Sequence, residues 1–151
     1  MKKFILIAVV VIIAAVAGVW YFVAPPKEAP GQLTGAIKGE TTYPSEGVPA
    51  LSICAQLVTD MQKTKCVDAP SQAIGQKELP KFSLSVKPGT YWVYAELVDP
   101  AELGLTESTK AYYTEFVRCG MKFECKDHSK IEVVVGSNQT IDNIVPGDWY
   151  E

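Results

Sequence analysis

The sequence predicts an all-β domain, a sandwich of seven or eight short strands, behind a single N-terminal transmembrane helix. Residues 4–24 form a run of 21 residues without a charged side chain, which is long enough for a helix to cross a bilayer. From residue 32 onward, apolar residues recur with a period of two rather than 3.6, as strands require. Turn-forming residues interrupt this alternation about every 8–12 residues, a spacing typical of β-sandwiches.

The N-terminal segment, residues 1–24, is interpreted as an uncleaved signal anchor. Two lysines precede the apolar run, and a basic flank keeps the N-terminus in the cytoplasm. Residues 15–17 offer an A-x-A cleavage motif, but the apolar run continues past them through Trp20 and Tyr21, where an interfacial aromatic belt is expected. We therefore expect a single-pass protein of the inner or cytoplasmic membrane with a periplasmic or extracellular C-terminal domain. Cleavage would instead give a secreted protein.

The rest of the chain divides into a spacer and one domain. Residues 25–31 are rich in proline and predict a short, stiff spacer, while residues 32–151 have the length of one domain. From residue 25 onward, 12 basic and 17 acidic residues give a net charge of −5, and the lysines are scattered. Nucleic acids and anionic membrane surfaces attract clustered basic side chains, so the composition excludes a nucleic-acid partner.

Individual strands are expected where the alternation is clearest. In the segment 91–98, Tyr91, Val93, Ala95 and Leu97 should face the core, because alternate side chains of a strand share one face. The turn at 87–90 contains a Pro-Gly pair that suits a tight reversal. The expected strands cover residues 33–40, 51–57, 65–67, 82–86, 91–98, 111–117, 131–135 and 140–145.

Four cysteines predict a disulfide framework, because disulfides are the default in an oxidising compartment. Four cysteines allow three pairings, and sequence proximity favours Cys54 with Cys66 and Cys119 with Cys125. Cys54 falls on the polar face of its strand, so its bridge should clamp a hairpin from outside the core. As an alternative, Cys119, Cys125 and the single histidine, His128, form a metal or redox site.

No catalytic motif accompanies these residues. The chain lacks G-x-S-x-G, H-E-x-x-H and P-loop sequences, so we predict a non-enzymatic protein without a cofactor. Glu115 is the acid in the most suggestive place, on the expected strand 111–117 with Tyr113 and Val117 on the same face. A partly buried glutamate paired with Arg118 or a lysine is the preferred interpretation.

The aromatic residues indicate a binding surface. There are more of them than a small core needs, and tyrosine and tryptophan are enriched where proteins bind partners or sugars. The predicted binding face for a protein, peptide or glycan ligand consists of Tyr112, Tyr113, Glu115, Trp149 and Tyr150.

Three segments also resemble a known family. Residues 35–40 (GAIKGE), 48–55 (VPALSICA) and 82–91 (FSLSVKPGTY) are similar, in this order, to the strands of the carboxypeptidase regulatory-like domain, also called transthyretin-like. The resemblance covers residues 32–98 and implies a β-sandwich that, in bacteria, is typically a non-catalytic module of envelope and surface proteins. No peptidase domain accompanies it, so peptidase activity is not implied. The second half looks similar to small bacterial envelope proteins of this fold.

Overall fold

The computed structural model describes residues 33–150, so the predicted anchor at 1–24 and the spacer at 25–31 lie outside the described residues. Within that range the chain forms eight strands and two short helices, and this confirms the all-β prediction. None of the helices in residues 33–150 has the length and apolar character needed to cross a membrane.

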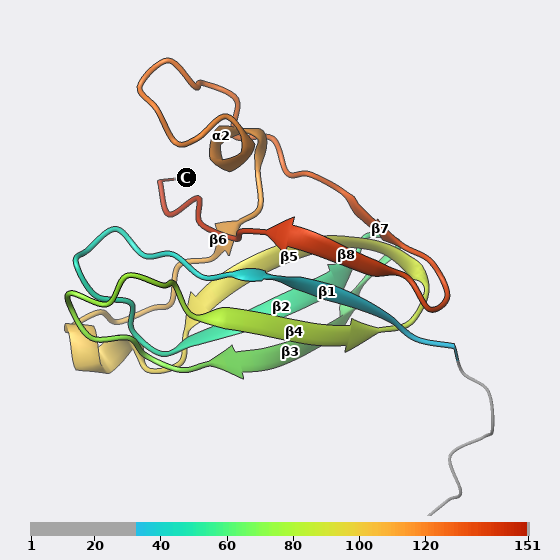
Figure 1. Cartoon of the computed structure of the whole chain (residues 1–151), viewed down its shortest axis with the longest axis horizontal. Helices are drawn as coiled ribbons and strands as arrows, with labels where there is room; N and C mark the ends of the chain where they lie inside the picture. The colour runs from blue at the N-terminus through green and yellow to red at the C-terminus, as the bar shows by residue number, and fades with distance from the viewer. Residues whose placement is uncertain (1–32, 151) are drawn as a thin grey trace, which may run out of the picture. The chain divides into compact units, whose positions relative to one another are not determined.

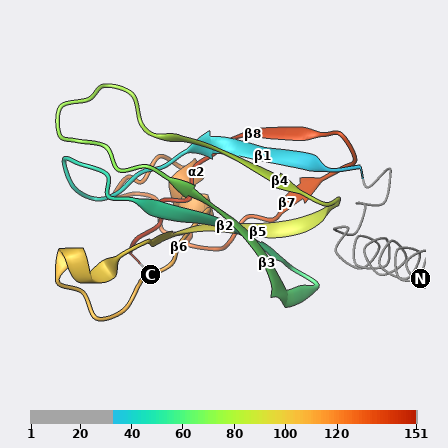
Figure 2. The same cartoon turned by 90° about the horizontal axis from the view of Figure 1, so that it is seen from below.

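One sheet contains three strands. The central strand is β1 (Gly35–Glu40), which runs antiparallel to β4 (Lys81–Val86) and parallel to β8 (Thr140–Ile144). Figure 2 shows these three strands as one layer. At Gly39 the backbone of β1 lies against that of β8, and a Cβ there would overlap the Ile144 carbonyl group. Only glycine therefore allows this approach of the two strands.

The second sheet contains the other five strands. Its order is β3 (Asp60–Ala69), β2 (Leu51–Leu57), β5 (Gly89–Leu97) and β6 (Ala111–Tyr112), and β7 (Val133–Val135) pairs with the beginning of β5. All its pairings are antiparallel. The strand predicted near 65–67 is therefore part of a much longer hairpin arm.

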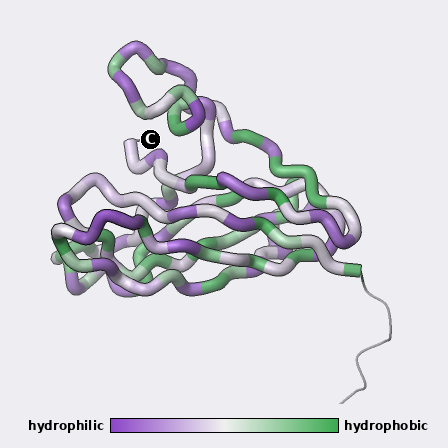
Figure 3. The backbone as a smooth tube through the Cα atoms, in the orientation of Figure 1, coloured by the Kyte–Doolittle hydropathy of each residue, from purple (hydrophilic) through white to green (hydrophobic). Residues whose placement is uncertain are grey.

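The core lies between the two sheets and is built from alternate residues of each strand. Hydrophobic and hydrophilic residues follow each other along the strands (Figure 3). The four residues of β5 predicted to face inward are all buried, which confirms the assigned face. The buried apolar cluster consists of Ile37, Val48, Leu51, Ile53, Ala55, Ala69, Phe82, Leu84, Val86, Tyr91, Val93, Ala95, Leu97, Ala111, Val133, Val135 and Ile144.

The first disulfide joins Cys54 to Cys66 across the β2–β3 pair. The two residues lie directly opposite in the register, and their Cα atoms are 4.0 Å apart. Neither belongs to the buried apolar cluster. The predicted pairing is confirmed. The predicted clamp outside the core is met only in part, because Cys66 is exposed but Cys54 is fully buried.

The prediction of one strand over residues 111–117 is wrong. Only Ala111–Tyr112 form a strand, and Glu115–Arg118 form the four-residue helix α2. Glu115 therefore does not share a strand face with Tyr113. The helix ends where Gly120, with φ of 98°, follows its C-cap residue Cys119. The expected loop 99–110 also contains a short 3-10 helix, η1 (Pro100–Leu103).

Candidate functional site

A groove of about 500 Å³ lies between the segment that follows α2 and the C-terminal residues. In Figure 1 this segment is the loop above α2, with the C-terminal end close to it. The groove is lined by side chains from three separate parts of the chain: Thr42, Pro44, Phe116, Met121, Lys122, Phe123, Cys125, Lys126, His128, Gly147, Trp149 and Tyr150.

A disulfide-closed loop, residues 119–125, forms one wall of the groove. The bond joins Cys119 to Cys125, with their Cα atoms 6.0 Å apart, and confirms the second predicted pairing. Gly120 and Met121 both have positive φ angles, which turn the chain sharply away from α2. As a result Phe123 protrudes, and 87% of its surface is exposed. The disulfide-closed loop thus presents an apolar side chain that is exposed to solvent rather than buried in the core.

A short backbone ladder beside β6 joins the segments that carry the groove residues. The amide of Tyr113 donates to the carbonyl of Val93 at 2.8 Å, and the amide of Ile131 donates to the carbonyl of Tyr113 at 3.0 Å. On the other side, the amide of Asp148 donates to the carbonyl of Tyr112 at 3.2 Å. The end of β6 thereby brings the C-terminal segment next to the segment that follows the disulfide loop.

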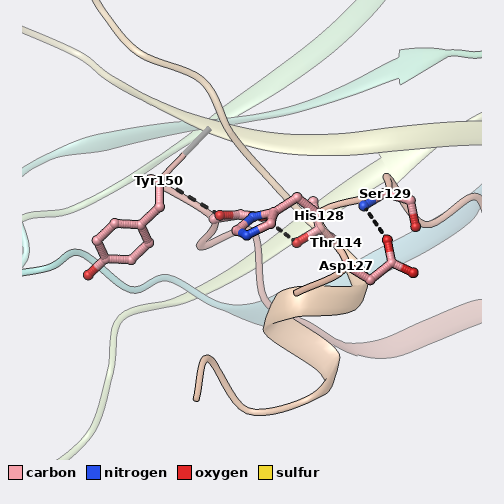
Figure 4. A network of polar contacts seen from close by, with 6 residues as sticks. Thr114, Asp127, His128, Ser129 and Tyr150 are labelled. Carbon is pink, nitrogen blue, oxygen red and sulfur yellow. Dashed lines mark hydrogen bonds and ion pairs between the residues drawn. The ribbon is translucent and has the colours of Figure 1, made fainter. Parts of the chain in front are cut away.

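A polar network ties these segments together around Asp148 (Figure 4). The Asp148 side chain is fully buried. Its Oδ2 accepts a hydrogen bond from Thr114 Oγ1 at 2.7 Å and lies 2.8 Å from His128 Nδ1. The Thr114 hydroxyl is thus used by Asp148 rather than for capping α2. These contacts satisfy a buried carboxyl group that would otherwise be costly.

His128 is held from two directions. Asp148 contacts Nδ1, and the imidazole stacks on Phe116 with ring centroids 4.6 Å apart and an interplanar angle of 19°. Tyr150 meets the same phenyl ring edge-on at 6.1 Å. The His128 side chain remains 36% exposed and lines the groove. Because Nδ1 is occupied, Nε2 is the nitrogen available to a ligand.

An aspartate–histidine pair can orient a general base, but a catalytic triad also needs a nucleophile within hydrogen-bond reach of the histidine. Among residues 33–150, Asp148 is the one side chain that hydrogen-bonds to His128. The alternative metal or redox site gains no support, because Cys119 and Cys125 are bonded to each other. The described residues contain no group of three His, Cys, Asp or Glu side chains placed to hold a metal ion.

Two acids close to the groove are engaged locally. Glu115 forms the expected ion pair with Arg118, at 2.6 Å. Asp127 accepts a hydrogen bond from the Ser129 amide at 2.9 Å, and hydrogen bonds from the Ser129 side chain and amide lower the pKa of the Asp127 carboxyl group. The Glu115 charge is therefore paired within its own segment, whereas exposed Asp127 is held by hydrogen bonds within its own turn.

The five residues predicted as a binding face are not all brought together. Tyr113 and Trp149 pack against the core cluster, and Trp149 Nε1 donates to the Thr42 carbonyl at 2.9 Å. Tyr112 lies beneath the Lys130 ammonium group, 3.6 Å from the ring centroid. Trp149 and Tyr150 line the groove, and Tyr150 is 63% exposed.

The sequence analysis missed the groove residues Phe116, Phe123 and Lys126, and it also missed Asp148, which lies behind His128. A signal existed for Phe123 and Lys126, because they stand inside and beside the short cysteine loop 119–125. None existed for Asp148, whose partner His128 is 20 residues away.

Comparisons with protein-family models, with curated proteins and with solved structures found no match to this chain.

Proposed function

We propose that this chain is a membrane-anchored, extracytoplasmic binding module without catalytic activity, and that the groove is its ligand site. The observation that carries the proposal is the open groove of about 500 Å³ lined by partly exposed aromatic side chains. This volume lies in the range of ligand sites. The polar network and the disulfide hold its walls in place, and such preorganisation reduces the entropy cost of binding.

Two features support an extracytoplasmic location. Both cysteine pairs are disulfide-bonded, as is usual in oxidising compartments. The uncharged run at residues 4–24 follows two lysines, which favours a cytoplasmic N-terminus. Protease added outside intact sphaeroplasts should digest residues 33–151, and lysis should not be needed. Protection until lysis would place the domain in the cytoplasm and contradict this part of the proposal.

We also propose that residues 32–151 form a carboxypeptidase regulatory-like sandwich of the bacterial envelope. The three motif segments fall on β1, on β2 and on the β4–β5 hairpin, and these strands belong to two packed sheets. That arrangement supports a binding or structural module. A refined experimental structure would test the topology, and a strand order different from that family's would refute the assignment.

The binding function is tested by screening the full-length protein against a random-peptide display library and a glycan array. Specific ligands should be recovered, and replacing Phe123 and Tyr150 by serine should abolish their binding. A matched control replaces Met61 and Val134, which are 58% and 64% exposed elsewhere in the domain, and should leave binding unchanged. Ligands that bind equally to both double variants would refute the groove as the site.

A further inference from the structure

We infer that the groove binds a peptide in which a carboxylate lies next to an apolar side chain. This inference rests on the proposed binding function and names its ligand class. It begins from the charge distribution around the groove, which differs from that of the rest of the domain.

Basic residues are concentrated in residues 110–130, the stretch that contains the disulfide loop, and two of them, Lys122 and Lys126, line the groove. Residues 33–150 carry 11 basic and 15 acidic residues, a net charge of −4. Within residues 110–130 the balance is five basic to three acidic, a net charge of +2. The remaining described residues carry six basic and 12 acidic residues, a net charge of −6. An otherwise acidic domain thus presents a positive segment at this one place.

The residues that line the groove show a stronger excess of basic over acidic side chains. They include Lys122, Lys126 and His128 but no aspartate or glutamate. Of the nearby acids, Glu115 is paired with Arg118, and Asp127 accepts from the Ser129 amide. Glu124 is an exposed residue of the disulfide loop but is not part of the groove lining. Asp148 is buried behind His128 and Thr114. A ligand in the groove therefore meets lysine ammonium groups, and these are donors that a carboxylate accepts from.

A positive charge and an exposed apolar side chain lie next to each other in the groove. The Lys126 ammonium group lies 4.0 Å from the centroid of the Phe123 ring. A carboxylate that meets Lys126 would therefore place its neighbouring side chain against the exposed phenyl ring. This spacing suits a peptide residue that has an acidic group beside it, either an acidic side chain or a free C-terminal carboxylate.

The rings are less suited to a sugar. Glycan sites stack sugar faces on open aromatic faces, but one face of Phe116 is covered by His128. One face of Phe123 is covered by Lys126, and Trp149 is packed edge-to-face against Tyr43 at 5.0 Å. The covered ring faces are not open to a flat pyranose, whereas the exposed Phe123 and Tyr150 side chains can contact an apolar side chain.

The test uses fluorescence anisotropy with the full-length protein in phosphatidylcholine nanodiscs, so that no anionic lipid competes. The first of four labelled octapeptides has blocked ends and a central phenylalanine flanked by acidic residues. The second replaces these acids by their amides, and the third replaces the phenylalanine by serine. The fourth is neutral internally and ends in phenylalanine with a free carboxylate.

The first or the fourth peptide should bind, and which of them binds identifies the source of the carboxylate. The amide and serine peptides should bind roughly tenfold more weakly. Lys122→Glu/Lys126→Glu should weaken binding by roughly tenfold, since each reversal turns an attraction into a repulsion. The matched control, Lys81→Glu/Lys87→Glu, changes the net charge equally on exposed lysines outside the groove lining and should have little effect.

Equal binding of the acidic and amide peptides would overturn the inference. Equal affinity of the two double lysine variants would overturn it as well, and so would the absence of binding by all four peptides. If the peptides fail while a glycan binds in a manner that depends on Phe123 and Tyr150, the proposed binding function survives and the peptide inference does not. If peptides and glycans both fail, the two proposals fall together.

Discussion

Removal of the Cys119–Cys125 disulfide should lower the free energy of unfolding by about 2.4 kcal/mol. The two cysteines are six positions apart, so the bond closes a loop of seven residues. Closing such a loop removes entropy from the unfolded chain, and the chain-entropy relation gives this value. For a domain of this size the loss corresponds to a fall in melting temperature of about 7–12 °C.

The variant to measure is Cys119→Ser/Cys125→Ala, because Cys125 is only 6% exposed and a serine hydroxyl there would lack a partner. Guanidinium unfolding followed by tryptophan fluorescence gives the free energy. As a comparison, Cys54→Ala/Cys66→Ser opens the longer loop, with a separation of 12, and should cost about 2.9 kcal/mol.

Stabilisation through the unfolded state also predicts which NMR signals of the folded domain should remain unchanged. If the bond acts through the unfolded state, the strand signals in an amide NMR spectrum should persist and only loop 119–125 should shift. A loss below about 1 kcal/mol would refute the entropic estimate. A loss above about 4 kcal/mol, with shifts spreading into β5, would show that the bond supports native contacts across the domain.

Three further predictions concern the sheets and the network. Gly39→Ala should destabilise the domain by about 1–3 kcal/mol, because its Cβ would overlap the backbone of β8; an unchanged denaturation midpoint would contradict the close β1–β8 approach. Thr114→Val should cost about 1–3 kcal/mol, because buried Asp148 loses a hydrogen-bond donor, whereas Thr114→Ser should restore most of the loss in the same denaturation assay. Burial raises the pKa of Tyr94 above its usual 10.0, and the Lys110 ammonium group opposes this rise. Lys110→Ala should therefore raise the pKa of Tyr94 further in a tyrosine-carbon NMR titration, and a downward shift would refute this account. Because the folded-state pKa is raised, the stability from neutral Tyr94 is fully present below about pH 10 and is lost as the pH rises through the folded-state value.

Much of the fold could be predicted from the sequence because strand alternation and turn residues are local signals. The alternation of Tyr91, Val93, Ala95 and Leu97 identifies a face without knowledge of the partner strand, since a strand's geometry alone sends alternate side chains to opposite sides. The prediction of a strand over residues 111–117 was wrong because it relied on local signals alone. Its aromatic residues favour a strand locally, but the strand ends at Tyr112, and the next turn packs through a hydrogen bond from Thr114 to Asp148, 34 positions away.

The sequence by itself determined most of the strand positions and the inward face of β5, and it favoured the two cysteine pairs, because each depends on residues close together in the chain. Only the tertiary structure decided the groove. It requires Trp149 to reach Thr42, 107 residues earlier, and His128 to reach Asp148 across 20 residues. Such contacts form because burial of the sheets brings distant segments together, and no local pattern of charge or hydrophobicity records which distant side chain will be the partner.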